Sequence, residues 1–143
     1  MDDLDRKLLA QLGADARLSV STLARRLGVA RSTIQARLER MEDSGVIAGY
    51  TLKLGEAAQR GRIRATVLVT LEPRATPVVL QRLKTFPAVE VAHTTSGRFD
   101  LILQLSASTT QDLDETLDAI GAITGVRSSE SLIHLSTKID RAV

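Results

Sequence analysis

The sequence contains no cysteine and very few aromatic residues, and both absences limit what the protein can be. Without cysteine the chain cannot form disulfides, thiolate metal sites or a cysteine nucleophile. Aromatic residues make up only 2% of the chain, so aliphatic side chains must fill its core. Stacking of unpaired bases on aromatic rings is disfavoured for the same reason. The lack of cysteine fits a reducing cytoplasm.

Long apolar runs are missing as well. No segment approaches the roughly 18 apolar residues of a membrane-spanning helix, and the opening MDDLDRKLLA carries acids where a secretory signal needs basic residues. The two histidines, His93 and His134, have no clustered partners, which argues against a metal site. No catalytic constellation or cofactor motif stands out. We therefore expect a cytoplasmic protein that is not an enzyme and has no cofactor and no membrane partner.

The charges that are present are segregated along the chain. The net charge of the 143 residues is only +2, but residues 20–40 hold five arginines against Glu39 alone, whereas residues 109–118 hold four acids and no base. Hydrophobic residues make up 43%, enough for the core of one domain or two small ones. The two halves of the chain are thus predicted to meet different partners.

The first half predicts three helices, because its apolar residues recur at helical spacing. Ser19 is an N-cap candidate for the second helix, and Gly28 suits a left-handed stop at its end. The third helix is expected from about 31 to 44, and residues 46–54 read as a strand with a turn. The inward stripes are Leu4, Leu8 and Leu12, then Leu23, Ala24 and Leu27, then Ile34, Leu38 and Met41.

The second half changes to the alternation of strands. Residues 63–71 alternate apolar and polar side chains, and Thr76 followed by Pro77 predicts a helix with Thr76 as N-cap. A capping pattern from Thr109 to Asp112 opens a second helix. Further strands at about 88–95, 99–106 and 127–137 complete a βαββαβ order. We place a first domain at 1–54, a linker at 55–62 and a second domain at 63–143.

The arginine-rich segment fits a helix-turn-helix, in which two short helices meet at a tight turn. With its apolar stripe turned inward, the third helix offers a narrow polar face to the major groove of double-stranded DNA. Gln35 could read adenine, and Arg31 or Arg37 could reach guanine or phosphate. The alternative is that these arginines cover an ordinary solvated helix face. The candidate DNA-binding residues are Arg25, Arg26, Arg31, Ser32, Thr33, Gln35, Arg37 and Arg40, with Arg25 and Arg26 best placed for backbone phosphates.

The order of these motifs resembles a known family. The stretches LDRKLL, DARLS, LARRLGV and SGVIAGY, followed by TLEP, SGRFDLIL and GVRSSESLIHL, are similar to the Lrp/AsnC (feast/famine) transcriptional regulators over nearly the whole chain. The resemblance implies an α+β fold with an N-terminal winged helix-turn-helix domain and a C-terminal ferredoxin-like βαββαβ domain. It also implies homodimers that assemble into tetramers or octamers. One departure is Ala30, where the family has a serine N-cap; Ser32 could cap a later helix start instead.

A second stretch, TTSGRFDLIL, indicates a ligand. The turn at Ser96–Arg98 could offer backbone groups to a carboxylate, and Asp100 could accept from an ammonium group; amino acids carry both. The simpler interpretation is that the residues of this turn and Asp100 have only a structural role. The resemblance implies an effector pocket between dimers, which here would use Thr95, Ser96, Gly97, Asp100, Ser129 and Ser131.

These features predict a sequence-specific transcriptional regulator whose assembly or DNA affinity responds to a small molecule, in particular an amino acid. A four-stranded sheet with helices on one side leaves a half-apolar face open, which suits a dimer. A dimer can place two recognition helices about 34 Å apart, in successive major grooves. The alternative is an architectural protein that wraps DNA with little sequence preference and no ligand.

Overall fold

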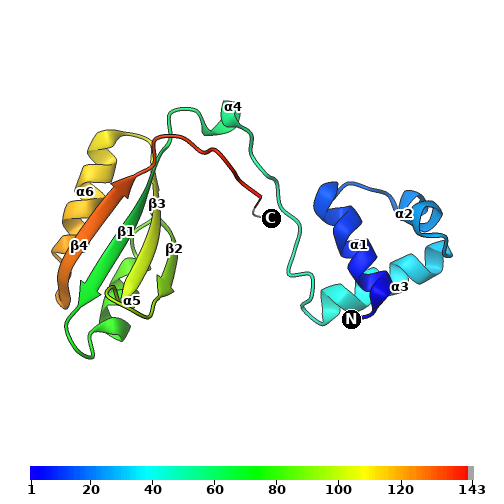
Figure 1. The fold of residues 1–143 in the computed structure, drawn as a ribbon, viewed down its shortest axis with the longest axis horizontal. Coiled ribbons are helices and arrows are strands. Elements are labelled where there is room, and N and C mark those ends of the chain that lie inside the picture. Colours follow the sequence, from blue (N-terminus) through cyan, green and yellow to red (C-terminus); the bar gives the residue numbers. More distant parts are fainter. Residues whose placement is uncertain (142–143) are drawn as a thin grey trace. The chain divides into compact units, whose positions relative to one another are not determined.

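The computed structural model describes residues 1–141, which divide into two compact units at residues 53 and 54 (Figure 1). The first unit contains three helices, α1 (Asp3–Ala14), α2 (Val20–Leu27) and α3 (Arg31–Asp43). Each helix sends apolar side chains into one small core, as the helical spacing predicts. The buried members are Leu8, Leu23, Ala24, Ile34 and Met41, and Leu4, Leu12, Leu27 and Leu38 pack against them.

The predicted ends of α2 are confirmed, but the start of α3 is less regular. The Ser19 hydroxyl accepts a hydrogen bond from the Thr22 N–H at 3.1 Å, and Gly28 ends α2 with a left-handed backbone, φ 67°. Helix α3 begins at Arg31, and Ala30 occupies its N-cap position without a side-chain hydrogen bond. The alternative start capped by Ser32 is therefore wrong. A missing cap typically costs about 1 kcal/mol.

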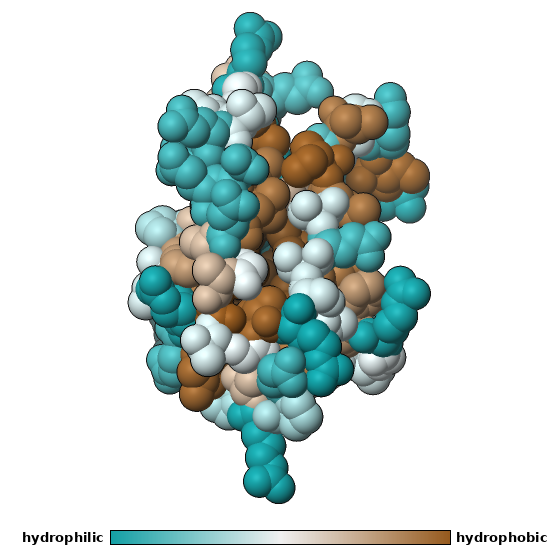
Figure 2. Space-filling model, turned by 90° about the vertical axis from the view of Figure 1, so that its left-hand side faces the viewer, coloured by the Kyte–Doolittle hydropathy of each residue, from teal (hydrophilic) through white to brown (hydrophobic). Residues whose placement is uncertain are grey.

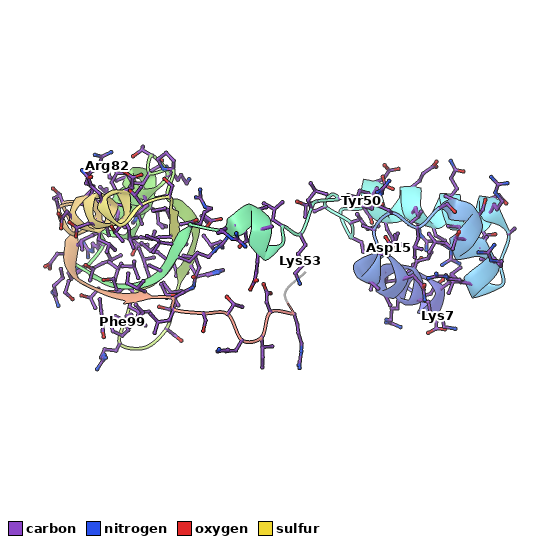
Figure 3. The ribbon with its side chains drawn as sticks, turned by 90° about the horizontal axis from the view of Figure 1, so that it is seen from above. Lys7, Asp15, Tyr50, Lys53, Arg82 and Phe99 are labelled. Atoms are coloured by element: carbon purple, nitrogen blue, oxygen red, sulfur yellow. The ribbon has the colours of Figure 1, made fainter. Side chains whose placement is uncertain are left out.

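The strand expected at residues 46–54 is not formed. Residues 48–55 have no regular secondary structure, and a short helix, α4 (Glu56–Gln59), follows within the segment expected as a linker. Tyr50 and Lys53 lie along this irregular segment (Figure 3). Alternating side chains alone do not make a strand, because the backbone N–H and C=O groups of a strand need a neighbouring strand to pair with.

The second unit is a four-stranded antiparallel sheet with two helices. Its elements are β1 (Ile63–Leu71), α5 (Thr76–Leu83), β2 (Val89–Thr94), β3 (Leu101–Ala107), α6 (Thr110–Gly121) and β4 (Val126–Ile133). The strand order is β2-β3-β1-β4, which confirms the βαββαβ prediction. Strand β4 ends at Ile133, four residues before the expected end.

Both helices of this unit cover the same face of the sheet. Alternate residues of β1 are buried, and they share one core with residues of α5 and α6: Ala65, Val67, Val69 and Leu71, with Val79, Leu83, Leu113 and Ile120. The N-cap prediction for Thr109 is confirmed by a 3.0 Å hydrogen bond from the Asp112 N–H. The one for Thr76 is wrong, because Arg74 (φ 66°) already turns the chain and Ala75 takes the N-cap position.

Gly125, just before β4, is the glycine whose replacement we expect to matter most for this core. Its φ is 105°, and an added Cβ would lie 2.8 Å from the Cβ of Ala75 and 3.2 Å from Cγ2 of Val79. We expect Gly125→Ala to lower the free energy of unfolding by about 2 kcal/mol or more. Gly121→Ala, where a Cβ meets no atom within 4 Å, is the matched control. Urea unfolding of both variants checks this, and equal stabilities would contradict it.

Candidate nucleic-acid interface and ligand site

The exposed side of α3 is polar and basic at its start and acidic at its end. Arg31, Ser32 and Gln35 are exposed near the N-terminus of the helix, and Thr33 is half-buried. The acids of α3 all lie in its second half, at Glu39, Glu42 and Asp43. A helix that enters the major groove contacts bases with its N-terminal residues. The first half of α3, which carries no acid, is therefore the part suited to DNA.

Three other arginines of this unit keep their positive charge available. Arg25 and Arg26 on α2 are exposed, as is Arg31 at the start of α3. Within residues 1–141, neither Arg25 nor Arg31 forms an ion pair. The guanidinium of Arg26 donates to Oε1 of Gln11 at 2.9 Å, which is a neutral partner. Because none of the three is paired with a carboxylate within the described residues, we call them the free arginines.

Arg37 and Arg40 have different surroundings, because both turn toward the start of α1. Arg37 donates Nη1 to the carboxylates of Asp2 and Asp5, the latter at 3.2 Å. Arg40 donates Nη2 to Oδ2 of Asp5 at 3.0 Å. Asp5 is only 1% exposed, and it forms a reciprocal capping box with Asp2. We call these four residues the Asp5 cluster.

The Asp5 cluster holds Arg37, which the sequence predicts to reach guanine or phosphate in a DNA groove, in contacts with the start of α1. The Arg37 side chain is 26% exposed and bound to two carboxylates, because it borders the buried stripe of α3 and faces α1. The side chain of Arg40 remains 58% exposed but shares its charge with Asp5. A signal for the cluster exists in the sequence: Asp2 and Asp5 are spaced as a capping box before an apolar helix.

Electrostatics favour the charged forms of Asp2, Asp5 and Arg37. The hydrogen bond from Arg37, with that from the Asp5 N–H, lowers the pKa of Asp2 to about 2. Burial acts to raise the pKa of Asp5, but the hydrogen bonds from Asp2, Arg37 and Arg40 together outweigh it and lower that pKa. The same contacts with Asp2 and Asp5 raise the pKa of Arg37. A buried carboxylate needs such partners to stay ionised.

The candidate ligand residues of the β2–β3 turn hold the turn together. The Thr95 N–H donates to the Asp100 carbonyl at 3.0 Å, and the Thr95 hydroxyl donates to the Phe99 carbonyl at 2.7 Å. Gly97 has a φ of 111°, and the Arg98 guanidinium stacks over the ring of Phe99 at 4.9 Å. Figure 3 labels Phe99 at this turn. Oδ2 of Asp100 accepts from the Leu71 N–H at 2.7 Å.

The other two candidates lie on a different strand. Ser129 and Ser131 belong to β4 and pair with Val69 and Val67 of β1. Because β1 lies between β3 and β4, Asp100 and the two serines are two strand spacings apart, about 10 Å. All six predicted ligand residues are exposed. A single chain thus presents them as two separate groups and does not gather them in one cavity.

The face of the sheet opposite the helices is a mixed surface. Leu68 and Ile102 pair across β1 and β3 on this face, and the Thr66 hydroxyl bridges Gln104 at 3.1 Å and His134 at 2.7 Å. We call it the open face. Elsewhere on this unit apolar side chains also reach the surface, and Figure 2 shows several between polar ones on the side that it displays. The large apolar residues that are exposed on the sheet are Val91, Leu132 and Ile133.

Each of the two units matches a known domain family. Residues 1–42 match the AsnC-type helix-turn-helix domain, and residues 64–143 match the Lrp/AsnC ligand binding domain. The chain is 31% identical to the transcriptional regulator LrpA of Mycobacterium tuberculosis over 142 residues, or 99% of this chain and 95% of that one. It is 27% identical to the regulator FL11 of Pyrococcus furiosus over 135 residues, or 94% and 89% of the two chains.

The structure of E. coli AsnC is similar over the full length. It covers 100% of this chain and 97% of its own, with a TM-score of 0.91 at 27% identity. Fold and sequence together define a helix-turn-helix transcriptional regulator with a ligand-binding domain, not an enzyme. The chain belongs to the Lrp/AsnC family. Across the described residues, no helix is long and apolar enough to cross a membrane, and no group of acids and histidines could hold a metal ion.

The Asp5 cluster predicts that acid loosens the DNA-binding unit. The pKa of Asp2 in the folded chain, about 2, lies below its ordinary value of 3.8. The stabilisation is therefore fully present above about pH 4 and is lost as the pH falls toward 2. Urea titrations at several pH values, followed by the amide signals of Leu8 and Ile34, measure this. Arg37→Gln should reduce the pH dependence and Arg31→Gln should not; equal behaviour of the two variants would contradict the assignment.

Proposed function

We propose that this regulator binds specific DNA sequences through the first half of α3. One observation carries the proposal: Arg31, Ser32 and Gln35 are exposed at the start of α3, and the free arginines form no ion pair, while Arg37 and Arg40 are bound to Asp2 and Asp5. Gln35 would pair with an adenine edge, and Arg31 with guanine or phosphate. Ser32 and Thr33 would contact the groove wall near them. Arg25 and Arg26 would bind phosphates, which position the helix without reading sequence.

We further propose that the protein works as a homodimer, with the open face of the sheet as its interface. Leu68 and Ile102 would form the apolar centre, and the hydrogen-bonded chain from Gln104 through Thr66 to His134 a polar part. The twofold axis of such a dimer would allow its two α3 helices to enter successive major grooves of the DNA. Residues 55–62, which include α4, would link the two domains.

The ligand in this proposal is an amino acid, bound where chains meet. A pocket that uses both the turn residues and Ser129 and Ser131 needs a second chain, because β1 separates the two groups within one chain. Backbone groups of the turn and the serine hydroxyls suit the carboxylate and ammonium groups of such a ligand. A transcriptional regulator from Neisseria meningitidis has the same fold, with 23% identity and a TM-score of 0.86. Its solved structure is a complex with L-Met.

The DNA proposal predicts different effects for two substitutions. Gln35→Ala should weaken binding to a duplex selected from a random pool by about 1–3 kcal/mol, because a base contact is lost. Its affinity for random duplex should not change. Arg25→Ala should weaken both equally and reduce the salt slope by about 1, because a phosphate contact is lost. Fluorescence anisotropy between 50 and 200 mM salt measures all of these, with Lys84→Ala as a control for charge.

Two outcomes would oppose this proposal. Equal wild-type affinity for selected and random duplexes, with a steep salt slope, would favour an architectural protein that wraps DNA. Unchanged binding by Gln35→Ala would mean that α3 does not read bases. Sedimentation velocity of wild type and variants is expected to give the same even-numbered oligomer, and a monomer would oppose the dimer.

The ligand proposal predicts that at least one amino acid raises the melting temperature. A ligand at about 100 times its Kd stabilises the folded protein by about 2.7 kcal/mol, because it binds only that state. A thermal-shift screen of the common amino acids measures this. Ser129→Ala and Ser131→Ala should reduce the shift, and Ser108→Ala, away from the turn and β4, should not. If no amino acid shifts the wild type, the ligand proposal is wrong, while the DNA proposal stands.

A further inference from the structure

Strand β1 extends beyond its pairing with β3. The pairing runs from Ile63 and Ala107 to Val69 and Leu101, so the last two residues of β1, Thr70 and Leu71, have no partner in the β3 ladder. On the other side, the pairing with β4 shifts register between these same two residues. Leu71 is 7% exposed, so its N–H needs a partner within the protein.

The partner is the side chain of Asp100. Oδ2 of Asp100 accepts from the Leu71 N–H at 2.7 Å. The backbone of Asp100 is anchored as well: its N–H donates to the Val69 carbonyl at 2.8 Å, and its carbonyl accepts from the Thr95 N–H at 3.0 Å. Asp100 thus attaches the turn formed by residues 95–99 to the end of β1, because two of its hydrogen bonds reach β1 and the third closes the turn.

The same end of β1 is tied to the start of β4. Leu71 pairs with Val126, and the next residue, Glu72, binds the Arg127 guanidinium through both carboxylate oxygens, at 3.3 and 3.1 Å. The hydrogen bonds that Arg127 donates to Glu72 and, to a smaller extent, the charge of Asp100 raise the pKa of Arg127. Asp100 therefore already has a cation near it and a hydrogen-bond donor on its carboxylate.

We infer that Asp100 is a positioning residue, which holds the turn at residues 95–99 in a fixed place relative to β4 and does not bind the ammonium group of the effector. The inference rests on the proposed ligand function. In this arrangement the Asp100 carboxylate accepts the hydrogen bond of the Leu71 N–H. The effector is held by the other groups of the turn and by Ser129 and Ser131, which the bond between Asp100 and Leu71 keeps in register.

Two conservative variants separate positioning from direct binding. Asp100→Asn keeps an oxygen acceptor at the same place but removes the charge, whereas Asp100→Glu keeps the charge but moves it by one methylene. If Asp100 positions the turn, the Asn variant retains the amino-acid affinity within about twofold, and the Glu and Ala variants lose roughly tenfold or more. If Asp100 binds an ammonium group, the Asn variant loses about 10–150-fold. Thermal-shift titration with the amino acid found in the wild-type screen measures these affinities, with Ser108→Ala as control.

Hydrogen exchange of the Leu71 amide, without any ligand, gives a second measurement. Its protection should be close to wild type in Asp100→Asn and lost in Asp100→Ala. Loss of ligand response in Asp100→Asn with retention in Asp100→Glu would overturn the inference, as would full protection of the Leu71 amide in Asp100→Ala. If the wild type responds to no amino acid, the proposed ligand function fails. The exchange measurement then decides by itself whether Asp100 fixes the turn.

Discussion

The DNA-binding unit depends on one buried carboxylate. Asp5 is enclosed between α1 and α3, and its charge is balanced by Arg37 and Arg40 and by the N–H of Asp2. A buried charge that loses its partners is strongly unfavourable, so α3 cannot rotate about its axis or slide along α1 without a large loss. Ile34 determines which side of α3 faces the core. The Asp5 cluster fixes the rotation more tightly and so determines which residues point outward.

The ligand-binding unit is governed by the order of its strands. Because β1 is central, the turn after β2 and the serines of β4 lie on opposite sides of it. Neither helix of this unit, α5 or α6, covers the open face of the sheet. In the proposed function, a second chain both completes the ligand site and covers that face. A ligand bound between chains shifts assembly only by its difference in affinity between the assembled states. In the proposed function, ligand binding and the assembly of chains are therefore coupled in one equilibrium.

Most of the fold follows from the spacing of apolar residues, since burial of those residues is what forms the elements. The bounds of β1, and the buried positions Leu8, Leu23 and Ile34, agree with the pattern. The segment at 46–54 shows the limit of such patterns, because a strand exists only with a partner. The role of Asp100 depends on where the β1–β3 ladder ends, and that is a property of register between distant segments.

Arg37 shows a different limit. It is three residues after Ile34 and so lies about 60° from it around the helix, at the border between the buried stripe and the exposed face. From such a position a long side chain can turn either way. Its actual direction is decided by Asp2 and Asp5, which are 35 and 32 residues away in the chain. The spacing of residues within α3 therefore does not predict the direction of the Arg37 side chain.

The uncapped start of α3 has a consequence for how the helix meets a surface. With Ala30 at the N-cap, no side chain fastens the first turn, so this turn frays more readily than the part anchored by Ile34 and Met41. Arg31 and Ser32 sit on that turn. The end of α3 that would contact DNA is therefore the end whose backbone changes conformation at the lowest free-energy cost. In the proposed function, this first turn would adjust to the local width of a groove while the end of α3 anchored by Met41 stays fixed.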